Sequence, residues 1–443
     1  MKKIVTFLLS TIVSLQLYIP LFKVYHKNGY DVRMIVRKSI DRKHSDPTLR
    51  EDDINSIVKK YRVTLIEIDE WLKDAGLTFC VDGDTNSKSY LNYIESLVVN
   101  LIGPMEKKER KRFTIVSLLE NTNYVWRYHN YINLVDYVIF PHKDYLQSYK
   151  DWHMKHHDEY QEVPEKDDDK IIVYKRYLKK KKLLKDYPIF DNILALEPSV
   201  KYETVEELEP ILDKQIESPK NLFLGTPKYD FKFDIKNIRK KHDIPNVDKI
   251  AVIFHPEYRI KIGVEKYGED FLQFYNDIHD WLRKLGYYVI VKDRLKDKRL
   301  KRELKGDLHV YNQYVFPNPS IELLHMADIA IFFSSSAIEE VFYTNTMIVD
   351  VVIDDVDRLG FLRSNKYCYI IDKKLPTQEQ FNQSVLKMKE DKQKKVHNKY
   401  IKKTMNKYYP LNKRPYSENI YNELEKIFTN RLKNKKAKKI KKK

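Results

Sequence analysis

The stretch from residue 326 to residue 354 constrains the fold most, because two apolar runs there flank a serine turn and a helix-like segment. The runs 329–333 and 347–352 are short and rich in aliphatic and aromatic side chains, as buried strands are. The segment 337–343 between them has glutamates in its first turns, where the helix dipole favours carboxylates. The pattern predicts a parallel strand–helix–strand unit.

Three consecutive serines, Ser334, Ser335 and Ser336, lie between the first strand and the helix of this unit. Open α/β sheets bind ligands at the carboxyl ends of their strands, and the free N–H groups of a helix N-terminus suit a phosphate. Serine is also a common helix cap where no ligand is bound. The turn is therefore a candidate phosphate site, with an ordinary structural cap as the alternative.

The N-terminal residues admit two interpretations. Two lysines followed by apolar residues look like a signal peptide or a membrane anchor, but polar residues and a proline interrupt the apolar run. A strand at 3–9, a helix at 15–26 closed by Asn28-Gly29, and a second strand at 30–36 account for more of the residues. We favour this Rossmann-like unit.

The rest of the chain alternates strand-like and helix-like segments, which is typical of a parallel α/β sheet. The expected strands are 61–68, 78–81, 113–118, 134–140, 222–224, 249–254, 287–292, 309–315 and 367–371, and the expected helices include 233–242, 270–285 and 320–326. A strongly charged stretch at 151–190 indicates a surface insertion. We expect an N-terminal Rossmann-like domain over 1–217, a second domain over 218–430 and a disordered basic tail over 431–443.

The charge and cysteine content of the chain indicate which partners and which cellular compartment to expect. The formal net charge of +18 favours an anionic partner such as a nucleotide, a nucleic acid, an anionic membrane or a polyanionic acceptor. Cys80 and Cys368 are too few for a disulfide framework and fit either a reducing compartment or indifference to the redox environment. We expect a cytoplasmic protein. The tail has nine basic residues and no acidic one. It can hold the protein peripherally on an anionic membrane, attract nucleic acid (the least favoured use), or only aid solubility.

Six segments in the second half, taken in order, resemble glycosyltransferases of the GT-B superfamily. They are 224–230, 252–259, 286–292, 323–328, 334–340 and 416–428. Their order is most similar to the CDP-glycerol glycerophosphotransferase group, and more loosely to UDP-N-acetylglucosamine 2-epimerases. The resemblance covers about residues 220–430, and the first half is similar only in architecture. It implies an α/β protein with two Rossmann-like domains facing a cleft, and a nucleotide-diphosphate donor as substrate without a bound cofactor.

The resemblance also implies roles for the serine turn and the helix after it. Ser335 and Ser336, with Ser334 beside them, are expected at the donor phosphates. Glu340, or Glu339, lies about one turn further on and is expected to bind the ribose hydroxyls.

Three further candidates follow strand ends in the second half. Arg259 and Lys292 are cations suited to a phosphate, although Arg259 can equally be an exposed surface residue. His255 is a candidate acid/base or phosphate contact, with a purely structural histidine as the alternative.

The sequence departs from the glycerophosphotransferase pattern in two places. That group has a His-Gly pair after the strand that corresponds to 113–119, and its histidine is assigned as the base. Here the strand runs into Glu120, which can act as a general base or as a helix cap. The group also often has a histidine where this chain has Arg294. The first departure favours sugar transfer over glycerophosphate transfer. Arg294 can hold a phosphate but cannot shuttle a proton.

No metal is expected from the sequence. Asp82-Gly83-Asp84 has the spacing of an Asp-x-Asp motif, but we interpret it as a turn. GT-B enzymes commonly stabilise the leaving diphosphate with protein cations and dipoles.

Three functions remain in competition at this point. The first is a transferase that moves a sugar or alditol-phosphate group from a nucleotide-activated donor to a glycan or polyol-phosphate acceptor. The second is a nucleotide-sugar 2-epimerase. The third is a non-catalytic binding protein that retains the fold, which the small number of glycines supports because sugar-nucleotide sites often use glycine for close approach.

Overall fold

The computed structural model describes the chain in segments and divides it into two compact units. The described segments are residues 3–9, 14–36, 51–81, 107–119, 135–142, 216–256, 260–293, 304–310, 319–344, 346–353, 368–393 and 415–440, with a few single positions between 105 and 214. Unit 1 comprises residues 1–230 and 408–443, and unit 2 comprises residues 231–407. Glu120, Arg259, Arg294, the turn at 82–84 and the charged stretch at 151–190 lie outside the described segments.

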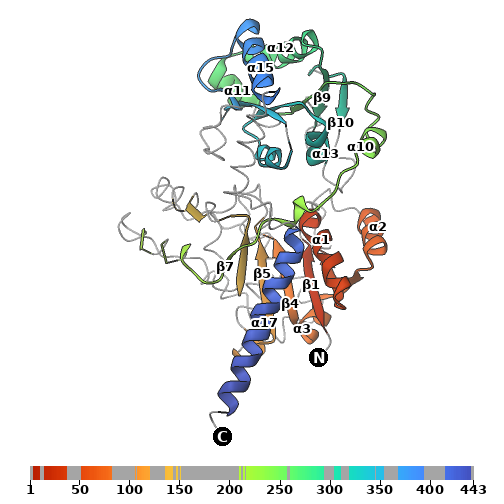
Figure 1. Cartoon of the computed structure of the whole chain (residues 1–443), viewed down its shortest axis with the longest axis vertical. Helices are drawn as coiled ribbons and strands as arrows, with labels where there is room; N and C mark the ends of the chain where they lie inside the picture. The colour runs from red at the N-terminus through yellow and green to blue at the C-terminus, as the bar shows by residue number, and fades with distance from the viewer. Residues whose placement is uncertain are drawn as a thin grey trace, which may run out of the picture. The chain divides into compact units, whose positions relative to one another are not determined.

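Unit 1 is built on a seven-stranded sheet in the order β3-β2-β1-β4-β5-β6-β7, with parallel pairings throughout (Figure 1). The strands are β1 (Ile4–Leu9), β2 (Asp31–Val36), β3 (Thr64–Leu65), β4 (Gly76–Val81), β5 (Phe113–Leu118), β6 (Tyr137–Phe140) and β7 (Asn221–Phe223). The helices are α1 (Ser14–Lys27), α2 (Glu51–Tyr61), α3 (Ile68–Asp74), α5 (Lys107–Arg110), the 3₁₀ helix η6 (Pro227–Tyr229) and α17 (Tyr416–Ile440). The chain order reverses between β1 and β4, as it does in a Rossmann sheet.

The first three elements confirm the predicted strand–helix–strand start. The ring of Phe7 on β1 lies 5.0 Å from the ring of Tyr18 and 4.8 Å from that of Phe22, both on α1, so the helix packs directly on the sheet. Gly29 follows α1 with a φ of 76°, a conformation that glycine adopts at low cost. Within the described segments, no helix combines the length and the apolar character that a membrane span requires.

Unit 2 is built on a six-stranded parallel sheet in the order β10-β9-β8-β11-β12-β13, which is the strand order of the dinucleotide-binding Rossmann fold. The strands are β8 (Ile250–Phe254), β9 (Tyr288–Lys292), β10 (Leu308–Val310), β11 (Ile329–Phe333), β12 (Met347–Val351) and β13 (Cys368–Ile371). The helices are α10 (Ile235–Lys241), α11 (Ile260–Tyr267), α12 (Asp270–Lys284), α13 (Pro319–Met326), the 3₁₀ helix η8 (Ser336–Tyr343) and α15 (Gln378–Gln393).

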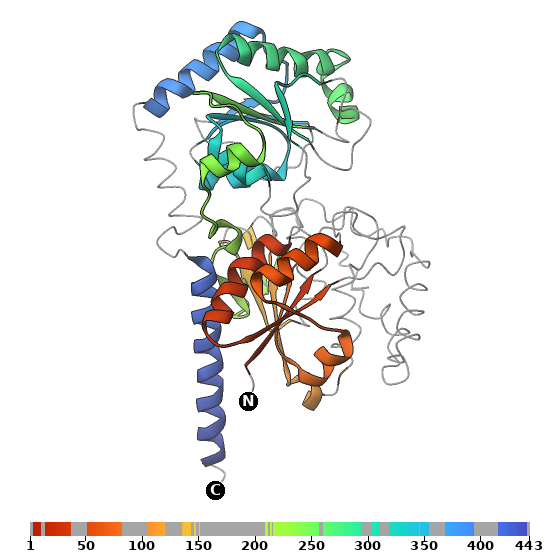
Figure 2. The same ribbon diagram turned by 90° about the vertical axis from the view of Figure 1, so that its right-hand side faces the viewer.

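Helix α12 covers one face of the unit 2 sheet because its apolar residues recur at helical spacing. The buried members of this stripe are Phe271, Phe274, Tyr275, Ile278, Trp281 and Leu282. They join one core cluster with the odd-numbered side chains of β8, β11 and β12 and with the apolar residues of α15. In Figure 2, α12 and α15 lie on one side of this sheet and α10 lies on the other.

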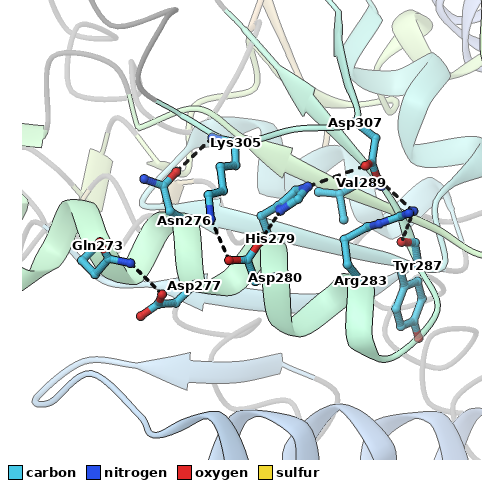
Figure 3. Close-up of polar contacts among 10 residues, drawn as sticks. All are labelled: Gln273, Asn276, Asp277, His279, Asp280, Arg283, Tyr287, Val289, Lys305 and Asp307. Atoms are coloured by element: carbon cyan, nitrogen blue, oxygen red, sulfur yellow. Dashed lines mark hydrogen bonds and ion pairs between the residues drawn. The ribbon is translucent and has the colours of Figure 1, made fainter.

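The opposite, polar face of α12 holds the segment that leads into β10 (Figure 3). The Asp307 carboxylate accepts a hydrogen bond from the Val289 N–H at 2.7 Å and forms an ion pair with Arg283 at 3.2 Å. Lys305 pairs with Asp280 at 2.7 Å. These contacts fix the edge strand of the sheet and explain why charged residues line this face of the helix.

The boundary between the units differs from the one predicted at 217. β7 pairs with β6 through Leu222 and Ile139, so the segment 222–224 belongs to the first sheet. Helix α17 packs on α1, although it follows unit 2 in the sequence. The chain therefore leaves unit 1 after Asp230 and returns near residue 408. Hydrophobic periodicity identifies a strand but not the sheet that it joins.

The predicted strand at 61–68 is wrong over most of its length. Helix α2 ends at Tyr61, α3 begins at Ile68, and β3 between them has only two residues. Val63 and Ile66 are buried while Leu65 is 42% exposed. The alternation that suggested a strand therefore comes from a turn between two helices.

Two other local predictions also need correction. The helix expected at 337–343 is a 3₁₀ helix, η8, rather than an α-helix. The backbone of α17 continues to Ile440, so residues 431–440 of the predicted disordered tail are helical. Lysine and arginine are good helix formers, and an established helix extends more easily than a new one begins.

Candidate functional site

The carboxyl edge of the unit 2 sheet collects predicted site residues on three adjacent strands, β9, β8 and β11. Lys292 ends β9, His255 follows β8 and Ser334 follows β11. The parallel register aligns these strands, so that their carboxyl ends lie side by side. The chain order reverses between β8 and β11, which is where open α/β sheets bind ligands.

Ser334 shapes the turn after β11. It has a φ of 48°, in the left-handed region that residues other than glycine rarely enter. Its buried hydroxyl oxygen accepts a hydrogen bond from the Ile353 N–H at 2.9 Å. This bond joins the end of β11 to the segment after β12, so the structure gives Ser334 a structural task in the turn where we expected a phosphate contact.

Ser335 is the N-cap of η8. Its backbone is extended, and its hydroxyl oxygen accepts a hydrogen bond from the Ala337 N–H at 3.3 Å. The side chain is only partly buried, in contrast to that of Ser334. Ser335 therefore presents a hydroxyl at the start of a helix, beside the switch point of the sheet.

The 3₁₀ geometry of η8 changes which positions share a face. In a 3₁₀ helix, residues three apart are eclipsed. Position 339 therefore lies above position 336, while position 340 lies above 337. The side chains of Ser336 and Glu339 lie outside the described part of the structure. Glu340 is 6% exposed.

A buried acid–histidine pair lies next to Lys292, and the sequence analysis missed it. Asp293 is 2% exposed, and its Oδ2 lies 2.8 Å from Nδ1 of His309 on β10. The Asp293 N–H donates to the Val310 carbonyl, and the His255 N–H donates to the Lys292 carbonyl. A carboxylate directly after a strand end was the available signal for Asp293, whereas His309 comes near it only through strand pairing.

Tyr275 of α12 closes this part of the edge from one face of the sheet. Its ring stacks on Phe333 at 5.4 Å and lies 6.2 Å from the His255 ring. Burial, together with the negative charge of Asp293, raises the pKa of Tyr275 above its ordinary value. The Tyr275 hydroxyl is buried and has no hydrogen-bond partner among the described residues. The short distance between the two rings places Tyr275 and His255 in the same local environment.

The structure thus brings His255, Lys292, Ser334 and Ser335 to one sheet edge. The predicted residues Arg259 and Glu120 are outside its description. In the described segments, no group of three or more histidine, cysteine, aspartate or glutamate side chains has the arrangement of a metal site.

Unit 1 has buried polar residues at the carboxyl edge of its own sheet, after β6 and β7. His142 follows β6 and is 5% exposed, and burial lowers its pKa to about 3. Thr226 and Lys228 follow β7 and are 2% and 8% exposed. The Leu224 N–H donates to the Phe140 carbonyl, which continues the pairing of the two strands up to this edge.

The two parallel sheets, each with a Rossmann strand order and covering helices, define a GT-B fold. Solved structures similar to this chain include a Listeria monocytogenes protein assigned as a UDP-N-acetylglucosamine 2-epimerase, with a TM-score of 0.53, 9% identity and 97% of each chain covered. That likeness shows the shared fold. Comparison with protein-family models finds no match, and neither does comparison with curated proteins.

Two further similar structures are those of a wall teichoic acid polymerase and of a protein solved with UDP. The wall teichoic acid polymerase TagF has a TM-score of 0.49 at 12% identity, with 98% of this chain and 90% of that chain covered. The S. aureus protein MnaA, solved with UDP, has a TM-score of 0.47 at 11% identity, with 96% of this chain and 97% of that chain covered.

Proposed function

We propose that the protein is a transferase that moves a sugar or alditol-phosphate group from a nucleotide-activated donor to a glycan or polymer acceptor. The observation that carries this proposal is the Ser335 turn at the switch point of the unit 2 sheet, where a helix start, a partly exposed hydroxyl and His255 lie on neighbouring strand ends. Helix starts and hydroxyl groups bind the phosphates of nucleotides, and a donor diphosphate is such a ligand.

The roles of the candidate residues follow from their chemistry. The hydroxyls and N–H groups of Ser335 and Ser336 bind the donor diphosphate, with Lys292 and Arg259 as cations that balance its charge. His255 donates a proton or a hydrogen bond to the phosphates.

Carboxylates have the two remaining proposed roles. Glu340, or Glu339, binds the ribose hydroxyls. Glu120 serves as the general base that activates the acceptor hydroxyl. No metal is required, because protein cations and dipoles stabilise the leaving diphosphate.

A nucleotide-sugar 2-epimerase is the second candidate. It is supported by the fold shared with the Listeria monocytogenes protein assigned as a UDP-N-acetylglucosamine 2-epimerase. Both activities use a nucleotide-sugar, so both need the same diphosphate contacts. They differ in whether an acceptor is consumed.

A panel of UDP-, CDP- and GDP-activated donors tests the proposal. Binding is measured by thermal shift, and turnover is measured with and without glycan and polyol-phosphate acceptors. Transfer that depends on an acceptor supports the transferase. Epimer formation or sugar release without acceptor supports the epimerase, and no binding of any donor indicates a non-catalytic protein.

The role of Glu340 has its own test. Glu340→Gln is expected to weaken donor binding at least tenfold, because a carboxylate hydrogen-bonded to hydroxyls contributes about 1.5–3 kcal/mol. Glu265→Gln on α11 is the matched control, since Glu265 is 62% exposed in its side chain. Calorimetry that finds equal affinity in the two variants contradicts the assignment, and Glu339→Gln is then the variant to compare.

The site of action is a further part of the proposal. A cytoplasmic enzyme with a basic C-terminal segment can stay close to a lipid-linked acceptor by peripheral attachment to an anionic membrane. Residues 431–443 supply the charge for this attachment.

A further inference from the structure

Lys228, in the short helix η6 of unit 1, is a largely buried lysine that makes no ion pair within the described segments. The residue is 8% exposed, and its ammonium lies 4.9 Å from the centre of the Tyr229 ring. In the segments that the structure describes, its ammonium has no hydrogen bond and no ion pair. Asp230, the nearest acid in the sequence, instead accepts hydrogen bonds from the Tyr416 N–H at 2.8 Å and the Ser417 N–H at 2.7 Å.

Thr226, two residues earlier, is a second buried polar group of the same turn. It is 2% exposed, and its hydroxyl has no hydrogen-bond partner among the described residues. Thr226 occupies the cap position of η6, but its side chain makes no cap hydrogen bond. An unpaired buried hydroxyl costs free energy, and a largely buried lysine that makes no ion pair in the described segments can accept an anion as its partner.

Backbone conformation and packing both constrain the turn that holds these two groups. Gly225 has a φ of 85°, and a side chain there would clash with the ring of Tyr416. Tyr416 is fully buried at the start of α17, which Asp230 caps. The turn is thus fixed by a glycine, a buried aromatic ring and a helix cap, and it is the connection after β7 at the carboxyl edge of the unit 1 sheet.

The chemistry of the pair selects an anion. A lysine ammonium binds phosphate as a point charge, and a threonine hydroxyl can donate to one of its oxygens. His142, which follows the neighbouring strand β6, is neutral at neutral pH, because burial lowers its pKa to about 3. Lys228 is therefore the charge that decides the class of ligand at this edge.

We propose that Lys228 and Thr226 form a binding site for a phosphate-class oxyanion in unit 1, separate from the serine turn of unit 2. On the proposed transferase function, on which this last step depends, the oxyanion belongs to the acceptor, which is then a phosphate-bearing molecule. Binding of the acceptor gives the Thr226 hydroxyl a hydrogen-bond partner and gives the Lys228 ammonium a counter-ion.

Lys228→Met is the main test, because it removes the charge and keeps an apolar stem of similar length. Without added anion, this variant is expected to melt at the same temperature as the wild type or higher, because the substitution breaks no ion pair of Lys228 in the described segments and places an apolar side chain at a largely buried position. Glycerol 3-phosphate and inorganic phosphate are expected to raise the melting temperature of the wild type well above that of Lys228→Met. Calorimetry should show at least a tenfold loss of glycerol 3-phosphate affinity.

Two further variants separate a specific site from general effects. Lys111→Met, at an exposed lysine of unit 1, is the matched control, since phosphate stabilises many proteins by exclusion from their surface. Thr226→Val keeps the side-chain shape and is expected to weaken glycerol 3-phosphate binding about three- to tenfold. Sodium chloride at equal ionic strength gives the baseline for charge screening.

UDP is the third ligand, and it separates this inference from the donor site. Lys228→Met should bind UDP as the wild type does. Equal phosphate-dependent stabilisation of Lys228→Met and Lys111→Met would overturn the oxyanion site. Loss of UDP binding in Lys228→Met, with glycerol 3-phosphate binding unchanged, would overturn the acceptor assignment. The wild type could also bind glycerol 3-phosphate through Lys228 but bind no nucleotide. That result would contradict the proposed function and still support the oxyanion site.

Discussion

Ser334 and Ser335 are adjacent and chemically identical, yet the structure gives their hydroxyls different partners. Ser334 accepts from the Ile353 N–H inside the sheet edge, whereas Ser335 accepts from the Ala337 N–H at the start of η8. The sequence predicted a phosphate contact for both. Residue type identifies a serine turn, but backbone conformation decides which hydroxyl faces inward.

Substitutions at the two serines are therefore expected to differ in whether they lower the unfolding free energy or the UDP affinity more. Ser334→Ala leaves a buried N–H without its acceptor and is expected to cost about 1–3 kcal/mol of unfolding free energy, with UDP affinity nearly unchanged. Ser335→Ala loses a cap worth about 1 kcal/mol and is expected to lower UDP affinity several-fold. Each variant is the control for the other in urea unfolding and calorimetry. A larger affinity loss in Ser334→Ala contradicts the assignment.

Gly225 offers a test of local packing. Gly225→Ala forces a side chain into a position with φ of 85° and against the Tyr416 ring, and we expect it to cost about 2–4 kcal/mol. Gly268 is a matched control, because it has the same φ of 85° but no atom within 4 Å of an added Cβ. Gly268→Ala should cost about 1 kcal/mol from backbone strain alone. Equal costs in urea unfolding would show that Tyr416 yields to the new side chain.

The lowered pKa of His142 implies that the unfolding free energy of unit 1 decreases as the pH falls. Burial lowers the pKa of His142 to about 3, so the unfolded chain, with an ordinary pKa of 6.5, binds the proton more tightly. The stabilisation is fully present above about pH 6.5 and is lost as the pH falls toward 3, at up to about 1.4 kcal/mol per pH unit.

Urea unfolding between pH 7.5 and 4.5 checks this dependence, since His142 alone should account for about 2–3 kcal/mol over the acid part of that range. His142→Gln should unfold with a shallower pH dependence, whatever its absolute stability. Parallel curves for the two proteins are the contradicting result.

At the scale of elements, α17 shows how one helix depends on contacts far away in the sequence. Asp230 caps its first turn, Tyr30 donates a hydrogen bond to Glu425, and the Tyr25 and Tyr421 rings lie 5.2 Å apart. The sequence of 416–428 suggests a helix, but its partners belong to the first 30 residues and to the end of η6. The helix is therefore stabilised by unit 1, which it completes.

Removing the cap of α17 is expected to loosen its first turns. Asp230→Ala deprives two buried backbone N–H groups of their acceptors and should cost about 2–3 kcal/mol, more than an average helix cap. Asp234→Ala is the control, because the Asp234 carboxylate at the cap of α10 accepts only exposed hydrogen bonds, from the Lys236 N–H and from the Asn237 side chain. Hydrogen exchange of residues 416–425 should accelerate only in Asp230→Ala. Unchanged exchange there would mean that packing on α1 holds the helix without its cap.

For the molecule as a whole, the distribution of charge predicts a salt-dependent interaction with anionic surfaces. The backbone of residues 431–440 is helical, and the sequence from 431 to 443 has nine basic residues. Beside an anionic membrane each basic residue contributes about 1 kcal/mol, and the attraction weakens with salt. A truncation that ends at Asn430 should sediment less with phosphatidylserine-containing vesicles than the full chain. Equal sedimentation of both proteins across a salt titration rules out this role for the tail.

Local pattern determined most elements, because apolar periodicity and turn residues act over a few positions. It placed β1, α1 and β2 at the N-terminus, β5 and β11 at their observed positions, and a serine turn at a strand end. The alternation of strands and helices indicated two Rossmann-like sheets, and the observed strand orders confirm them.

Only the tertiary structure decided where distant segments meet. It placed β7 in the first sheet, returned α17 to unit 1, paired His309 with Asp293, and buried Lys228 without an acid in the described segments. These outcomes depend on pairings between residues far apart in the chain, and their free energy comes from burial and desolvation that no local pattern encodes. The serine turn can be recognised in the sequence because a helix cap is a local feature. The burial of Lys228 and Thr226 cannot be recognised there, because it depends on segments that are distant in the sequence.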